Sequence, residues 1–164
     1  MIRDRMPKPM VKFEKHVSAW VQPPIVGMFS GELKTKTGKI PIGVTRFPGI
    51  ISAVTLSIGS GKDDAGDVMK VTANIYAGVN GADAVCSTAP AIAYVSGEAN
   101  AARTTANVIS GEAKGILPAV VNPTYATLAA GDIVYMQLDV TRTATPTNEI
   151  AQIAVVVDID PVLP

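Results

Sequence analysis

Hydrophobic and polar residues alternate along most of the chain after Gly49, which is the pattern of strands that bury one face of a sheet. Over Ser52–Ile58 every second residue is apolar, and the same alternation recurs over Met69–Tyr76 and Ile133–Val140. The last stretch, Ile150–Ile159, is apolar on both faces at its centre. It therefore predicts a central strand, with a neighbour on each side.

Turn residues separate these segments. Asn80 and Gly81 both accept positive φ and predict a hairpin turn, while Gly131 and Asp132 predict a second turn in which Asp132 bonds its own backbone. Shorter strand pieces are expected at 84–87 and 91–95, and the alternation is weak between residues 103 and 121. About eight strands result. They predict an all-β fold, an antiparallel β-sandwich with the topology of a jelly roll.

Composition supports this class. Val and Ile together number 35, whereas Leu numbers only 6. β-Branched side chains lose rotamer freedom in a helix but pack well on a pleated sheet.

The first 48 residues differ from the rest. They contain six of the twelve prolines, which prevent a long helix and interrupt strands. All three Phe and the only Trp also lie here, and aromatic burial orders a segment. The sequence therefore predicts two parts: an extended N-terminal arm over residues 1–48, ordered by docking, and a β-sandwich over residues 49–164.

The two parts also carry net charges of opposite sign. The formal net charge is zero, but residues 1–48 hold nine basic and three acidic residues, and residues 49–164 hold five basic and eleven acidic ones. The two parts thus carry +6 and −6, and an acidic protein surface is the expected partner of the arm. The predicted partner-binding residues are Arg3, Arg5, Lys8, Lys12, Phe13, Lys15, Trp20, Phe29, Lys34, Lys36, Lys39 and Arg46. The alternative is an arm that wraps its own sandwich. Nucleic acid is not expected as a partner, because the basic residues alternate with acids and prolines instead of forming blocks.

Few residues are suited to catalysis or metal binding. The single cysteine, Cys86, can form no internal disulfide and is expected to be a small buried hydrophobic residue; the single histidine, His16, is expected to lie on the surface or in an arm contact. The run from Gly59 to Lys62 lacks the spacing of a phosphate-binding loop. No catalytic residue, metal site or cofactor is predicted.

The acidic residues fit no metal loop. Asp63, Asp64 and Asp67 do not have the spacing of a calcium-binding EF-hand, and neither does the pair Asp158 and Asp160. They are expected to be solvated.

No apolar run of about 18 residues is present, and the first residues do not resemble a signal peptide. The protein is expected to be made in a reducing cytoplasm and to have no membrane partner.

One resemblance bears on function. The run from Phe47 to Gly59, the segment Val71–Tyr76 with Asn80 and Gly81, and the stretch Leu128–Val134 before two final strands resemble the small β-sandwich proteins of tailed-bacteriophage virions. Capsid cement and decoration proteins belong to this group, and related modules occur in head and tail fibres. The resemblance covers about residues 47–160 and consists of strands and turns, so it implies no catalytic residue. It implies a jelly-roll module, often trimeric, that sits on a capsid lattice.

Three functions follow as hypotheses. The first is a virion structural protein that is assembled in the host cytoplasm and binds the major capsid protein through its arm as a homotrimer. The second is a fibre or receptor-binding module that recognises a cell-surface glycan, for which Tyr94 and Tyr125 are the aromatic candidates in loop regions. The third is a small hydrolase that depends on His16.

Overall fold

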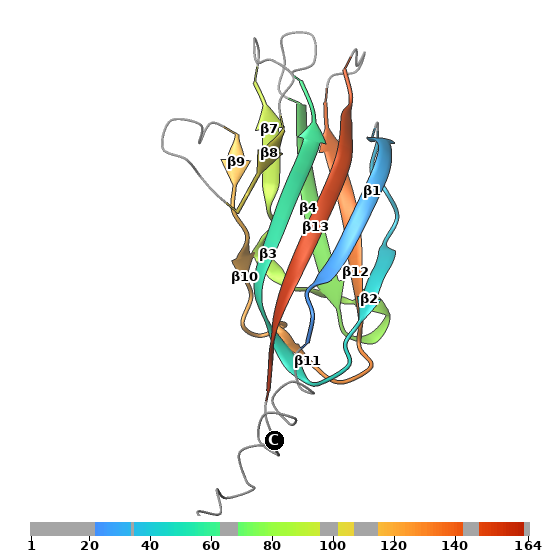
Figure 1. Ribbon diagram of the computed structural model, residues 1–164, viewed down its shortest axis with the longest axis vertical. Coiled ribbons are helices and arrows are strands. Elements are labelled where there is room, and N and C mark those ends of the chain that lie inside the picture. Colours follow the sequence, from blue (N-terminus) through green and yellow to red (C-terminus); the bar gives the residue numbers. More distant parts are fainter. Residues whose placement is uncertain are drawn as a thin grey trace, which may run out of the picture.

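The computed structural model is a β-sandwich made of two antiparallel sheets (Figure 1). It describes residues 22–33, 35–62, 69–95, 102–106, 115–142 and 148–162. The fold class predicted from the alternation is therefore confirmed.

The first sheet, called sheet A, contains the two longest strands. Its order is β1-β13-β3-β11, and β8 also pairs with β3. The bounds are β1 (Ile25–Leu33), β3 (Gly49–Ser60), β8 (Arg103–Thr104), β11 (Thr127–Leu128) and β13 (Ile150–Pro161). The strand β13 lies between β1 and β3, as its two apolar faces predicted.

The second sheet, sheet B, has the order β2-β12-β4-β7-β9, and β5 also pairs with β4. Its strands are β2 (Ile40–Val44), β4 (Met69–Ala77), β5 (Asp83–Ala84), β7 (Ala91–Tyr94), β9 (Ile116–Leu117) and β12 (Ile133–Thr141). A separate two-stranded ladder joins β6 (Cys86–Thr88) to β10 (Val120–Val121), and a 3₁₀ turn, η1, spans Val79–Gly81.

The chain passes repeatedly from one sheet to the other. The strands β1, β3, β8 and β13 lie in sheet A, while β2, β4, β7 and β12 lie in sheet B. The resulting orders, β1-β13-β3-β8 and β2-β12-β4-β7, are those of a jelly roll. Each strand turns its apolar residues toward the other sheet, and together these side chains make one continuous core.

The arm expected over residues 1–48 does not extend that far. The strand β1 pairs with β13, and β2 pairs with β12, so residues 25–44 supply the edge strand of both sheets. The side chains of Ile25 and Leu33 are 7% and 3% exposed. A Cβ on Gly27 would lie 2.6 Å from Ile42 Cγ2, which shows how closely β1 approaches β2. The boundary at residue 48 is thus wrong, because residues 25–44 are needed to close one side of the sandwich. Residues 1–21 lie outside the described residues.

Both predicted turns are present. The strands β4 and β5 form an antiparallel hairpin around η1, with Asn80 at φ 57° and Gly81 at φ 65°. At the second turn, Gly131 has φ 90° and donates its N–H to Thr45 O at 2.8 Å. Asp132 Oδ2 accepts the Ala129 N–H at 2.7 Å, so Asp132 bonds neighbouring backbone as expected.

Candidate functional site

Only part of the predicted partner-binding set falls within the described residues. Phe29, Lys36, Lys39 and Arg46 do, and all four lie in the sandwich or its connecting loops. The remainder lie outside the described residues: Arg3, Arg5, Lys8, Lys12, Phe13, Lys15, Trp20 and Lys34. The histidine candidate His16 and the acids Asp63, Asp64 and Asp67 also lie outside them.

Two of the lysines contact their own sandwich. Lys36 Nζ lies 3.0 Å from Asp139 Oδ1 on β12. Lys39 Nζ donates to Gly81 O at 2.5 Å and lies 3.9 Å from the centroid of the Tyr76 ring. An exposed ion pair contributes about 0–1 kcal/mol, so these contacts position the β1–β2 connection more than they stabilise the fold. For these two residues, pairing within one subunit is what the structure shows.

The other two residues differ in exposure. Phe29 is half-buried in β1 and packs against the core. Arg46 is exposed, and its backbone N–H donates to Gln22 Oε1 at 2.9 Å. Since Gln22 is 7% exposed, this bond fixes the point at which the chain enters the sandwich.

The outer face of sheet B is polar. On β4, Lys70, Thr72 and Asn74 point outward, and Asn74 Nδ2 donates to Asp139 Oδ2 on β12 at 2.7 Å. Next to them, Tyr76 Oη donates to Gln137 Oε1 at 3.2 Å. Side chains on this face therefore bond to one another across the strands.

The outer face of sheet A has a different character. Its rows follow the strand register: Val26 lies opposite Val156, which lies opposite Thr55, and the next row holds Met28, Ala154 and Ser57. None of these six residues is charged. Val26 is 49% exposed and Met28 is 78% exposed. This set of six residues is called the uncharged face below.

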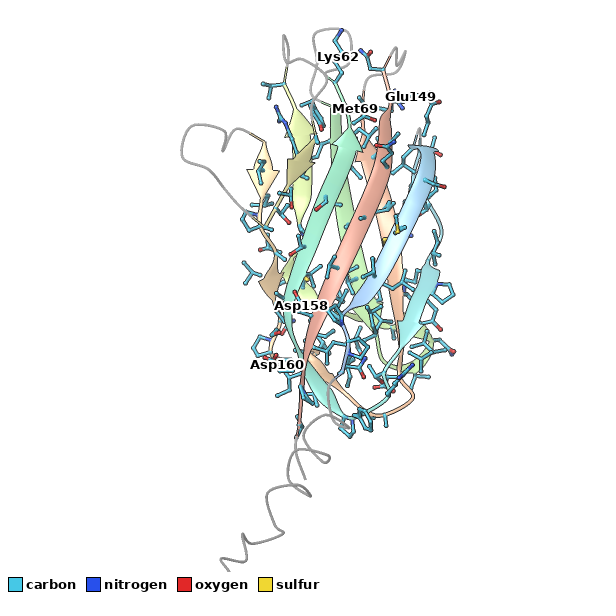
Figure 2. The ribbon with its side chains drawn as sticks, viewed as in Figure 1. Lys62, Met69, Glu149, Asp158 and Asp160 are labelled. Atoms are coloured by element: carbon cyan, nitrogen blue, oxygen red, sulfur yellow. The ribbon has the colours of Figure 1, made fainter. Side chains whose placement is uncertain are left out.

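Acidic residues border the uncharged face at one end. Asp158 and Asp160 continue the outward positions of β13, opposite Ala53 and Ile50 of β3. Figure 2 shows them at the lower end of the sandwich, opposite the end that carries Lys62, Met69 and Glu149. The chain enters β1 near the acidic end, because Ile25 pairs with Val157.

A groove of about 450 Å³ lies beside β3. One wall is formed by Ser52–Thr55 and the other by Pro118–Val121, with Thr105 and Ala106 between them. All of these residues are uncharged. Sequence reasoning missed the groove, because its lining residues are brought together by pairing between distant parts of the chain.

The two tyrosines considered for glycan binding differ in their exposure to solvent. Tyr94 lies in β7, is fully buried, and has the Arg103 guanidinium carbon 4.3 Å from its ring centroid. It therefore has no face free to stack on a sugar. Tyr125 lies in the turn before β11 and is 42% exposed.

Cys86 is half-buried in β6 and packs against the core. Burial raises the pKa of its thiol from the ordinary 9.0 to about 11, because the thiolate is poorly solvated there. The group is thus an unreactive thiol near neutral pH.

Thiol labelling checks this. At pH 8 a pKa of about 11 leaves roughly 100-fold less thiolate than the ordinary value does, so a thiol-specific reagent should label the folded protein about 100-fold more slowly than the urea-unfolded chain. The folded state keeps the proton that the unfolded chain loses above pH 9, so stability should decrease between pH 9 and 11. Equal labelling rates in the two states would contradict the burial of the thiol.

Among the described residues, no three or more His, Cys, Asp or Glu side chains gather in a way that could hold a metal ion. The described part of the chain also contains no helix long and apolar enough to cross a membrane. Comparison with protein-family models, with curated proteins and with solved structures gave no match.

Proposed function

We propose that the chain is a structural protein of a tailed-phage virion that binds the outer surface of the capsid as a homotrimer and stabilises the shell. In this proposal the uncharged face joins the copies, and the basic residues between Arg3 and Lys15 bind the major capsid protein. The observation that carries it is the difference between the two outer faces of the sandwich.

The polar face of sheet B uses its hydrogen-bonding groups internally, as in the Asn74–Asp139 and Tyr76–Gln137 bonds. The uncharged face instead offers Val26, Met28 and Val156 to its surroundings, with no charge to desolvate. Interfaces between identical subunits are depleted of charge at their centre and are more apolar than the remaining surface. The uncharged face has this composition, and the acidic pair Asp158 and Asp160 lies at its rim.

The basic N-terminal residues provide the contact with the shell in this proposal. Residues 1–21 hold five basic and two acidic residues, and they join the sandwich at Gln22. A trimer presents three such segments. Once one has bound the shell, the others bind at high effective concentration, which raises the overall affinity by about 10²–10⁴ without new contacts. A trimer that bridges several capsid subunits opposes their separation.

The test compares one substitution on each face. Val156→Arg places a charge in the middle of the uncharged face, and Thr72→Arg places the same charge on the polar face. We expect Val156→Arg to yield folded monomers by light scattering and to co-sediment with particles of the encoding virus about 100-fold more weakly, because multivalency is lost. Thr72→Arg should keep both the trimer and the binding. A Val156→Arg protein that still forms trimers would refute this role of the face.

A second pair of variants tests the capsid contact. Arg3→Glu, Arg5→Glu and Lys8→Glu together should leave the trimer intact but weaken particle binding about 10-fold or more, with loss of the salt dependence. The matched control reverses three basic residues of the sandwich, Arg46, Lys62 and Lys70. Equal losses in the two triple variants would show that the terminal basic residues have no specific role.

A further inference from the structure

A homotrimer needs two different contact surfaces on each copy. Identical subunits around a threefold axis pack head to tail, so the surface that a copy offers to one neighbour differs from the surface that it offers to the other. The uncharged face can therefore supply only half of each contact. The other half must lie elsewhere on the sandwich.

One side of the sandwich is closed by the ladder of β6 and β10. The strand β6 follows β5, which pairs with β4 of sheet B, and between β5 and β6 the Val85 N–H donates to Ile75 O at 2.9 Å. Its partner β10 lies against β3 of sheet A. The ladder thus spans from one sheet to the other, beside β3 and away from β1 (Figure 1). Its outer surface faces sideways, at an angle to the outer faces of both sheets.

This side of the sandwich carries no charge. Residues 84–95 and 115–131 contain no Lys, Arg, Asp or Glu, and the pairing of β6 with β10 and of β7 with β9 brings the two segments together. Val121 packs against the core, whereas Val120 is 55% exposed and Leu117 is 44% exposed. Four exposed residues of these segments are called the side surface below: Ser87, Leu117, Pro118 and Val120.

The side surface matches the uncharged face in chemistry. Leu117 and Val120 stand among proline and hydroxyl groups on one, as Val26 and Met28 stand among methyl and hydroxyl groups on the other. A charged partner would lose solvation at either surface without gaining a counter-charge. Packed together, the two surfaces would bury apolar groups on both copies and leave no charge at the centre of the contact, as interfaces between identical subunits require.

The two surfaces adjoin along β3. Thr55 of the uncharged face and Val120 of the side surface both line the groove. Surfaces that adjoin at an angle close a ring of a few copies when they pack head to tail, whereas surfaces on opposite sides of a molecule build an open filament. The placement of these two surfaces is therefore that of a closed ring.

A second exposed apolar pair does not meet this condition. Val44 and Ile133 lie opposite each other in β2 and β12 and are 54% and 38% exposed. They point outward from sheet B, because the neighbouring Val134 points into the core. The pair is thus on the far side of the sandwich from the uncharged face, and a contact between the two would stack copies without closing a trimer.

We propose that the side surface of one copy packs against the uncharged face of the next, and that three such contacts close the trimer. In this arrangement β3 and the groove lie nearest the threefold axis, and β1 lies toward the outside. The inference rests on the trimer of the proposed function and is independent of whether that trimer binds a capsid.

Light scattering on full-length variants tests whether the side surface is needed. Val120→Arg places a charge in the middle of the side surface, and the matched control Val79→Arg places the same charge on η1, where Val79 is 83% exposed. We expect Val120→Arg to raise the concentration at which half of the copies are assembled by about 100-fold or more, since a charge would be buried without a partner. Val79→Arg should assemble as the unmodified protein does. Trimers of unchanged affinity in Val120→Arg would overturn the proposal.

Disulfide trapping identifies the surface that the side surface touches. All proteins carry Cys86→Ser, so that only introduced thiols react. Met28→Cys labels the uncharged face, Val120→Cys labels the side surface, and Val79→Cys is the control. In mixtures at equal micromolar concentration, we expect Met28→Cys to form a disulfide with Val120→Cys at least about 10-fold faster than with Val79→Cys. It should also react with Val120→Cys faster than with itself.

The outcomes separate this contact from the proposed function. Equal rates with the two acceptors, or fastest reaction of Met28→Cys with itself, would overturn the head-to-tail contact. A monomeric unmodified protein would refute the trimer and this contact together. A protein that forms trimers with the expected disulfide but does not bind particles would refute the capsid role and leave the contact standing.

Discussion

Deletion of residues 1–46 should unfold the protein, whereas deletion of residues 1–21 should leave the sandwich folded. The longer deletion removes β1 and β2, the edge strands of both sheets, and with them the buried side chains of Ile25 and Leu33. Loss of one large buried aliphatic side chain costs about 2–5 kcal/mol, and a whole domain is stable by only about 5–15 kcal/mol.

The longer deletion also exposes the edge of β13, which lowers the stability of the sandwich further. The strand β13 would become an edge strand with Ile153, Val155 and Val157 no longer covered by β1. An exposed apolar edge promotes aggregation as well as unfolding. Circular dichroism and urea unfolding of the two truncated proteins measure the difference. A cooperative transition in the protein lacking residues 1–46, at the urea midpoint of the full chain, would show that β1 and β2 are dispensable.

Tyr94→Ala is expected to lower the free energy of unfolding by about 3–5 kcal/mol, the range for loss of a buried aromatic side chain. The ring of Tyr94 is fully buried, and the Arg103 guanidinium lies against it while Arg103 Nη1 donates to Ala93 O at 2.6 Å. Removing the ring leaves a cavity and takes away the aromatic face that Arg103 contacts.

Tyr125→Ala is the matched control. Its side chain is 42% exposed, so the same substitution should change the free energy of unfolding by no more than about 0.5–1 kcal/mol. Thermal or urea unfolding of both variants measures the difference in their free energies of unfolding. Similar losses in the two proteins would mean that Tyr94 is less well packed than its burial indicates.

The sandwich was predictable because its central strands have one face in the core. Val54, Leu56 and Ile58 of β3 are buried at every second position, and the same period holds in β4 and β12. The two turns were predictable from residue chemistry, since Asn80 and Gly81 adopt the positive φ that these residue types accept.

The edge strands were missed for a physical reason. Charged residues and prolines are the features by which sheets protect an exposed edge, and they made residues 22–48 look like an arm. Pro41 lies in β2 where only one side of the strand is paired. The alternation of Ile25 and Gly27, and of Ile40 and Ile42, was the available signal.

The groove could not be predicted. It exists because β8 and β11 pair with different parts of β3 and leave Ser52–Thr55 between them. That gap depends on contacts between residues about 45 to 80 positions apart, which no local pattern in the sequence encodes.

The length of β3 and β13 also has a practical use. Each strand has 12 residues, and at about 3.3 Å per residue they set the two ends of the sandwich roughly 40 Å apart. Gln22 and Val162 leave at the end near Asp160, while Lys62 and Met69 lie at the opposite end (Figure 2). A peptide epitope inserted between Lys62 and Met69 would therefore be displayed at the far tip of a rigid spacer, well clear of any surface to which the N-terminal residues are attached.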